Sequence, residues 1–168
     1  SSTGLTVNCA NSDLAFAHIY ENSQPSSAWT SFHSNHYSMG LFGESLEAES
    51  LYRINASNTF MGTIGCHAGL NVADAGLISD LDLVQGVAFN GGTTIGSTAY
   101  TYGSSWGINY TEALIADFTD RFLAADGQSM GTLLQTTKQA YLASRPWFDY
   151  LDAKTLMPIN LYGLPMVR

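Results

Sequence analysis

The sequence predicts an α/β protein built around a mostly parallel sheet. Three observations indicate this fold class. Short β-branched or aromatic runs alternate along the chain with longer stretches of helical periodicity. The segments between successive predicted strands are long enough to be crossovers rather than hairpins. The 168 residues, of which 45% are hydrophobic, are enough for one domain with a sizeable core, so we expect residues 1–168 to form a single domain.

The first part of the chain is predicted to hold three strands and one helix. Apolar and polar residues alternate over 14–20, between Asn, Ser and Pro residues that favour turns. A strand is expected at 27–32, where "SAWTSF" runs into a histidine. Leucine, tyrosine and isoleucine residues cluster on one side of a helix predicted over 44–54. The next strand is "NTFMGTIGC" at 58–66, which ends at a cysteine.

The second part is predicted to be mainly helical. A short helix capped by Ser79 ends at a pair of glycines, and the β-branched and aromatic stretch 93–103 follows it as a strand. Apolar residues repeat at helical spacing along 109–127 until a glycine stops the pattern. A further helix is expected at 129–144, before an Arg-Pro pair. The tail at 156–168 is expected to add a last strand to the sheet.

Composition narrows the classes of partner. The net charge of −8, from 14 acidic and 6 basic residues, argues against nucleic acid and against an anionic membrane surface, and suits a cationic ligand or substrate. No apolar run is long enough to be a transmembrane helix. A Lys-poor chain rich in Ser, Thr, Asn and Gly is typical of exported proteins, so an extracellular or cell-surface location is expected. The start has no signal-peptide pattern and no Met, and we expect an upstream chain or domain of the same protein.

The segment "TIGCHAGLN" at 63–71 holds the most informative residue, Cys66. Ligands of parallel sheets bind beyond the carboxyl ends of the strands, and both His33 and Cys66 follow predicted strands. A thiol becomes a good nucleophile when an imidazole accepts its proton. His67 is a poor candidate because side chains of consecutive residues diverge, whereas "FHSNHY" supplies His33 and His36 from another strand.

Other interpretations of Cys66 stay open on the residues alone. It fits an inert buried thiol, or half of a disulfide with Cys9 in an oxidising compartment. Zinc ligation by Cys66 with His33, His36 and His67 is possible by residue type but lacks the usual short ligand spacings, so neither a metal nor a cofactor is expected. A serine nucleophile has no G-x-S-x-G support.

Several motifs carry a resemblance to a known family. "TIGCHAGLNVAD" is similar to a "GCHSGLNVPD" segment, "GSTAYTYG" to "GNTGYGYGD", and "HSNHY" to "HFDHYR". "NYTEALIADFTDRFL", "MGTLLQTTKQAYL" and "DAKTLMPINLYGLPM" are similar to "YSExLxxxFxxxL", "GxALxxAKxxYL" and "DEKxLMExxLYGLPM". The motifs are collinear and cover roughly residues 27–168. In these motifs the chain resembles the gingipain-like cysteine peptidases of the caspase-like clan.

The resemblance implies a caspase-like three-layer α/β/α sandwich, completed by an upstream segment, and peptide-bond hydrolysis by a Cys–His dyad. Cys66 would be the nucleophile and His33 the general base, with His36 as the alternative. The oxyanion hole would consist of the backbone N–H groups of Cys66 and Ser34. Several relatives cleave after Arg or Lys by means of an acidic pocket residue, a role open to Asp74, Asp80 and Asp82. Asp74 is favoured, because Asp80 and Asp82 also suit the first turn of a helix.

Two further points concern the substrate and the activity. Tyr100, Tyr102 and Trp106 form an aromatic cluster that either lines a substrate groove or packs against a missing segment. Ser34 and Thr101 stand where relatives often have glycine, as does Ala99. A catalytically inactive caspase-like domain that acts as a structural or assembly subunit is therefore the alternative function.

Overall fold

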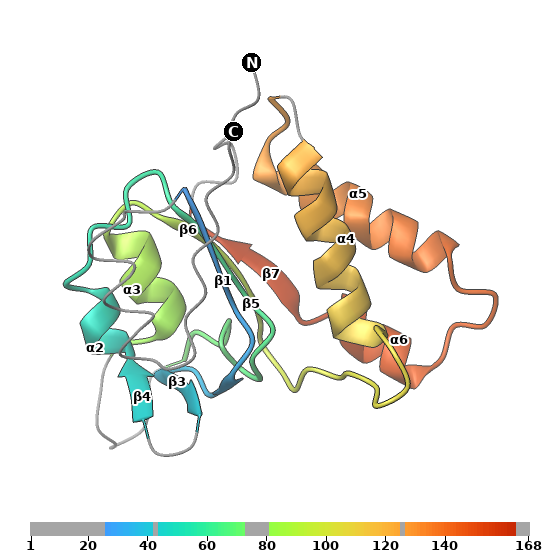
Figure 1. Cartoon of the computed structure of the whole chain (residues 1–168), viewed down its shortest axis with the longest axis horizontal. Coiled ribbons are helices and arrows are strands. Elements are labelled where there is room, and N and C mark those ends of the chain that lie inside the picture. Colours follow the sequence, from blue (N-terminus) through green and yellow to red (C-terminus); the bar gives the residue numbers. More distant parts are fainter. Residues whose placement is uncertain (1–25, 42–43, 73–80, 125–126, 164–168) are drawn as a thin grey trace.

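The protein is a mixed α/β structure with a mostly parallel four-stranded sheet (Figure 1). The computed structural model describes residues 26–41, 44–72, 81–124 and 127–163. The sheet has the order β1 (Ser27–Thr30), β5 (Phe60–Thr63), β6 (Thr93–Ser97) and β7 (Ile159–Tyr162). The first three strands are parallel, and β7 runs antiparallel to β6. The predicted α/β class is confirmed.

Helices cover both faces of this sheet (Figure 1). On one side lie α2 (Ala48–Leu51) and α3 (Leu83–Phe89). On the other side lie α4 (Tyr110–Ala124), α5 (Met130–Ala143) and α6 (Tyr150–Leu156). The described residues therefore form three layers, helix, sheet and helix.

Each face of the sheet has its own hydrophobic core, because successive strand residues point to opposite faces. Ala28 and Met61 belong to the core under α2 and α3, whereas Trp29 and Phe60 belong to the core under α4 and α5. The other buried members of the first core are Met39, Leu46, Ala48, Leu51, Ile54, Ala56, Ala68, Leu83 and Val87. Those of the second are Ile95, Leu114, Ile115, Phe118, Met130, Leu133, Leu134, Tyr141 and Ile159.

A small antiparallel sheet follows β1 and corrects one prediction. It consists of β2 (His33–Ser34), β3 (Ser38–Leu41) and β4 (Glu44–Glu47). The helix predicted over 44–54 is wrong for its first four residues, because β4 pairs with β3 from Glu44 to Glu47. Leu46 is buried between more exposed neighbours, which is strand alternation. Pairing with β3 overrides helix propensity here, and only Ala48–Leu51 is helical.

Two more element boundaries differ from the prediction. The strand expected over 93–103 ends at Ser97, whose hydroxyl accepts a hydrogen bond from the Ala99 N–H at 3.2 Å and turns the chain. Helix α3 has Asp82 as its N-cap and not Ser79, which lies outside the described residues. The Asp82 N–H donates to Gln85 Oε1 at 3.2 Å, which favours a helix start at this point. The strand expected at 14–20 also lies outside the described residues, and α6 was not predicted.

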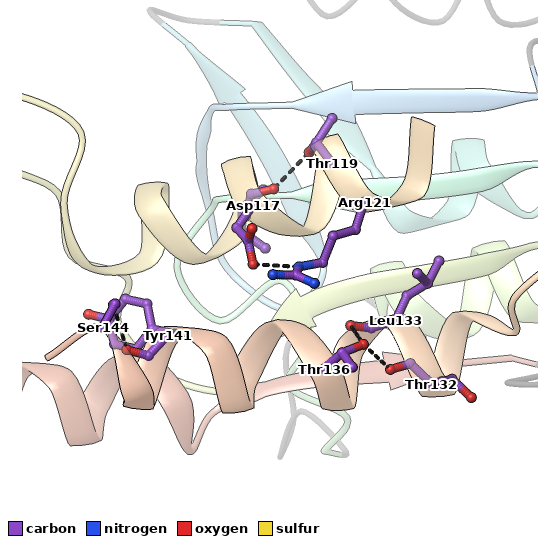
Figure 2. A network of polar contacts seen from close by, with 9 residues as sticks. Asp117, Thr119, Arg121, Thr132, Leu133, Thr136, Tyr141 and Ser144 are labelled. Atoms are coloured by element: carbon purple, nitrogen blue, oxygen red, sulfur yellow. Dashed lines mark hydrogen bonds and ion pairs between the residues drawn. The ribbon is translucent and has the colours of Figure 1, made fainter. Parts of the chain in front are cut away.

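The two long helices confirm the predictions over 109–127 and 129–144. Ser129 caps α5, because its Oγ accepts a hydrogen bond from the Thr132 N–H at 3.3 Å. Some polar side chains of these helices bond within their own helix, as Figure 2 shows: Arg121 Nε lies 2.7 Å from Asp117 Oδ2, and the Thr136 hydroxyl donates to the Thr132 carbonyl. The buried residues that α4 and α5 contribute to the second core are mainly apolar. Along the described ranges, no helix has the length and apolar content that a bilayer span requires.

Candidate functional site

His33 and Cys66 occupy equivalent places beyond two neighbouring parallel strands. The register of β1 and β5 pairs Thr30 with Thr63. His33 and Cys66 each lie three residues beyond this pair. The carboxyl ends of parallel strands meet at one edge of a sheet, which is where α/β proteins bind ligands. The structure therefore brings the two segments that hold the predicted dyad to the same edge.

A direct hydrogen bond joins these segments. The Ser34 hydroxyl donates to the carbonyl oxygen of Cys66 at 2.8 Å. Gly65 lets the two segments approach, because a Cβ at this position would lie 1.9 Å from Ser34 Oγ and 2.8 Å from the Phe32 carbonyl oxygen. Contacts this short are sterically forbidden, so a glycine is needed for the observed packing. The residue next to His33 is thus fixed against Cys66.

The backbone N–H of Ser34 points away from the small sheet. In an antiparallel pair, hydrogen-bonded and non-hydrogen-bonded residue pairs alternate. The Asn35 N–H donates to the Ser38 carbonyl at 2.9 Å, so Ser34, paired with Met39, occupies a non-hydrogen-bonded position. Its N–H therefore faces the side opposite β3. This orientation leaves the amide available for the oxyanion role that the sequence predicts.

The sulfur of Cys66 is held by Thr101. Cys66 is a half-buried free thiol among the described residues, and Cys9, its partner in the disulfide alternative, lies outside them. Within the described chain, the polar contacts of the Sγ are with the Thr101 hydroxyl at 3.4 Å and the Thr101 N–H at 3.5 Å. The Thr101 N–H donates to the sulfur, whereas either the Thr101 hydroxyl or the thiol is the donor in the other contact. The contact of Thr101 with the sulfur was missed, although Thr101 lies in the motif "GSTAYTYG", because it joins residues 35 positions apart in the chain.

The loop that follows Cys66 is clamped to β6 and β7. The Gly69 N–H donates to the Ser97 carbonyl at 2.8 Å, and the Tyr162 hydroxyl donates to the Gly69 carbonyl. A Cβ at Gly69 would lie 2.7 Å from the backbone of Gly96, so two glycines permit this close approach. Burial raises the pKa of the Tyr162 hydroxyl. The thiol therefore sits on a backbone fixed from three strands.

The two candidate bases lie in different settings. His33 is exposed, and because its neighbour Ser34 directs its side chain to Cys66, the His33 imidazole leaves β2 on the other face. His36 is half-buried in the turn between β2 and β3, with its ring 5.1 Å from that of Tyr37. The His36 carbonyl accepts a hydrogen bond from the Leu83 N–H at 2.7 Å. This bond holds the loop between β2 and β3 against the first turn of α3.

His67, which the sequence made a poor candidate for the base, packs against the loop after β6. Its backbone has a φ of 56°, and its N–H donates to the Ala99 carbonyl at 2.9 Å. Its ring packs edge-on against Tyr100 with centroids 4.5 Å apart. Among the described residues, no three His, Cys, Asp or Glu side chains gather closely enough to hold a metal ion. The zinc alternative consequently has no support in this part of the chain.

The predicted substrate-binding residues are dispersed. Tyr100 lies near the thiol, packed on His67, with 63% of its surface exposed. Tyr102 is tied to α4 and α6, because its N–H donates to Thr111 Oγ1 and its hydroxyl accepts from Lys154 Nζ. Trp106 is 96% exposed in the loop between β6 and α4. Asp74 lies outside the described residues.

A groove that the sequence did not indicate lies between β1, β5 and α4. Its volume is about 650 Å³. One wall is Trp29 and Ile64, of which Ile64 lies two residues before Cys66. The other residues of the lining are Ser104, Gly107, Ile108, Glu112, Ile115, Ala116, Thr119 and Asp120. The groove is mainly apolar and carries two carboxylates and no basic side chain.

Compared with known proteins, the chain matches no family model, and no curated protein matches it significantly. The assignment of a function therefore depends on the geometry of the site and on the sequence motifs.

Proposed function

We propose that this chain is a cysteine endopeptidase domain of caspase-like fold that hydrolyses peptide bonds through Cys66 and His33. The observation that carries the proposal is the equivalent placement of these residues, three positions beyond the paired Thr30 and Thr63. The collinear motifs of residues 27–168 support the same assignment. The hydrogen bond from Ser34 to the Cys66 carbonyl adds a physical reason for the two segments to act together.

The chemistry assigned to this geometry is acyl transfer. The sulfur of Cys66 attacks the scissile carbonyl carbon while the thiol proton passes to the His33 imidazole. The N–H groups of Ser34 and Cys66 stabilise the negative charge that develops on the carbonyl oxygen. The C–N bond breaks, the amine leaves with the proton from the imidazolium, and water then hydrolyses the thioester. His33 is exposed and its imidazole leaves β2 on the face opposite Ser34, so proton transfer requires the His33 segment to move toward the sulfur when substrate binds.

Thiol-dependent cleavage of reporter peptides tests the proposal. The complete protein is assayed on peptides that end in Arg, Lys or Ala before the reporter group, with and without iodoacetamide. We expect cleavage that iodoacetamide abolishes, loss of activity to background in Cys66→Ala, and a fall of about 10²- to 10⁴-fold in His33→Ala. His36→Ala tests the alternative base: activity within about twofold keeps the role with His33, whereas an equal fall in His36→Ala alone assigns it to His36. Cleavage that persists without the thiol, or no cleavage at all, contradicts the proposal.

Two details of the proposal have their own readout. Preference for Arg or Lys peptides over Ala in the same panel would support basic specificity, for which Asp74 is the candidate residue. Loss of that preference in Asp74→Asn, with Ala-peptide cleavage retained, would identify this carboxylate. The protein is proposed to act outside the cell or on its surface.

A second function, an inactive structural subunit, is favoured by a different observation. The described polar contacts of the Cys66 sulfur are with Thr101, while His33 is directed to the opposite face of β2. Large aromatic side chains are exposed, among them Trp147 at 87%. Such surfaces are typical of proteins that pack against partners. An intact, alkylation-reactive thiol without any cleavage would favour this alternative.

A further inference from the structure

A stripe of residues along α4 forms one wall of the apolar groove. The spacing of these residues places them on a single face of the helix, and they are Glu112, Ile115, Ala116, Thr119 and Asp120. A carboxylate stands at each end of the stripe, and Ile115 and Ala116 lie between them. Because a helix rises about 1.5 Å per residue, the two acidic positions are about 12 Å apart along its axis. This wall is therefore acidic at both ends and apolar in the middle.

The remaining lining of the groove is mainly apolar. Trp29 and Ile64 come from the side of the sheet, and Ile108 comes from the loop before α4. All residues of the lining lie within the described ranges, and no Lys, Arg or His is among them. The volume of about 650 Å³ is within the range of small-molecule sites, about 300–1,000 Å³. A small organic molecule can therefore occupy the groove, and it needs none of the backbone groups at the outer edge of β1.

The two carboxylates of the groove are not paired with a cation of the described chain. The ion pair of α4 in this part of the chain joins Arg121 to Asp117 and includes neither Glu112 nor Asp120. The Glu112 carboxylate lies against the loop, because a Cβ at Gly103 would be 2.8 Å from Glu112 Cδ and Oε1. Glu112 lies in the first turn of α4, where the helix dipole stabilises it, but Asp120 precedes the last turn and gains nothing from the dipole. A bound cation would stabilise both carboxylates.

We propose that this groove binds a linear aliphatic diamine. Its two ammonium groups pair with Glu112 and Asp120, while the methylene chain between them packs on the apolar middle of the wall. An ammonium nitrogen lies about 2.8 Å from a carboxylate oxygen, so carboxylates about 12 Å apart suit nitrogens about 6–12 Å apart. The net charge of −8 adds a long-range attraction for such a dication. The proposal does not depend on catalysis at Cys66.

A series of diamines of increasing length tests the site. Isothermal titration calorimetry of the full chain gives the Kd of 1,2-diaminoethane, of longer diamines up to 1,10-diaminodecane, and of the monoamine hexylamine. Each bond of an extended alkyl chain advances about 1.25 Å, so nitrogens about 6–12 Å apart require about four to eight carbons. Diamines of this length should bind at least about tenfold more tightly than diaminoethane or hexylamine, and more weakly as salt rises. Equal binding of diaminoethane and 1,6-diaminohexane would indicate only attraction of counterions and overturns the proposal, as does the absence of binding by any diamine.

Variants assign the binding to the two ends of the stripe. Glu112→Gln and Asp120→Asn should each raise the Kd of 1,6-diaminohexane at least about threefold, and the double variant should bind it no better than hexylamine. Asp117→Asn is the matched control, because it removes the same charge from α4 outside the groove, and its Kd should stay within about twofold. Ala116→Lys places an ammonium of the chain itself in the groove and should abolish binding. Circular dichroism checks that each variant is folded. Unchanged binding in the double variant, or an equal loss in Asp117→Asn, overturns the proposal.

Discussion

Gly65→Ala is the substitution for which the structure makes the sharpest prediction. The new methyl group would lie 1.9 Å from Ser34 Oγ and 2.8 Å from both Ser34 Cβ and the Phe32 carbonyl oxygen. The backbone of Gly65 does not have a positive φ, so alanine meets no conformational penalty there. The cost is therefore steric, and it falls on the contact that holds the His33 segment against Cys66.

The magnitude follows from two contributions. Overpacking at a site bounded by backbone costs about 1–3 kcal/mol. The displaced Ser34 hydroxyl also loses its hydrogen bond to the Cys66 carbonyl, which is worth about 1 kcal/mol. We expect Gly65→Ala to lower the free energy of unfolding by about 2–4 kcal/mol. With a urea m-value of about 2 kcal/mol/M, the midpoint falls by about 1–2 M.

A double-mutant cycle measured by urea unfolding separates this mechanism from a general loss of stability. Ser34→Gly removes the hydroxyl and the Cβ that the new methyl group would meet, and alone it should cost about 1–2 kcal/mol. The double variant should lose about 1–2 kcal/mol less free energy of unfolding than the sum of the losses in the two single variants, because most of the steric conflict is gone. Strict additivity, or a Gly65→Ala protein as stable as the parent, would refute the argued contact between the two segments.

Three further variants test other contacts. Thr101→Val removes the hydroxyl 3.4 Å from Cys66 Sγ and should cost about 0.5–1.5 kcal/mol in urea unfolding, whereas Thr101→Ser keeps the contact; equal stability of all three proteins would exclude a role for the hydroxyl. Burial and the hydrogen bond to Asp152 raise the pKa of Tyr141 to about 12. The protonated hydroxyl therefore stabilises the folded state fully below the unfolded pKa of about 10, and this contribution is lost as the pH rises through about 12. Tyr141→Phe should cost about 1–3 kcal/mol at pH 7 and flatten the fall in stability above pH 10, as thermal unfolding across pH would show. Asp149→Ala removes the acceptor of two N–H groups at the start of α6 and should cost about 1 kcal/mol in urea unfolding; a loss below about 0.3 kcal/mol would contradict the cap.

The elements predicted best were those with long, uniform patterns. The helical spacing of 109–127 and 129–144 and the β-branched start at Thr93 each specify one structure locally, and the tertiary structure agrees with them. The segment 44–54 failed because its leucines suit either a helix or a short strand, and pairing with β3 decides the outcome. Helix α6 was missed although its capping pair, Asp149 and Asp152, is visible in the sequence. A run of seven residues was too short for periodicity to indicate a helix.

The strands that hold the candidate site were predicted from the sequence, but the side-chain contacts within the site were not. The ends of two apolar runs were sufficient to place His33 and Cys66 at one edge of the sheet. The contact of Thr101 with the thiol joins segments 35 residues apart and depends on the turn after Ser97. The groove is likewise a product of how α4 lies across the sheet. Neither follows from local sequence, because each depends on a distance set by tertiary packing.

The division of the two cores along the chain has a consequence for synthesis of the protein. The buried residues of the first core all lie between Ala28 and Val87, whereas the second core needs residues as far as Ile159. Those 72 additional residues take on the order of 4–14 s to leave a ribosome at about 5–20 residues per second. Until α4 has been made, Trp29 and Phe60, which pack against Phe118 and Phe122 in the folded protein, have no helix to cover them. This face of the nascent sheet is where a chaperone would bind and where premature aggregation would begin.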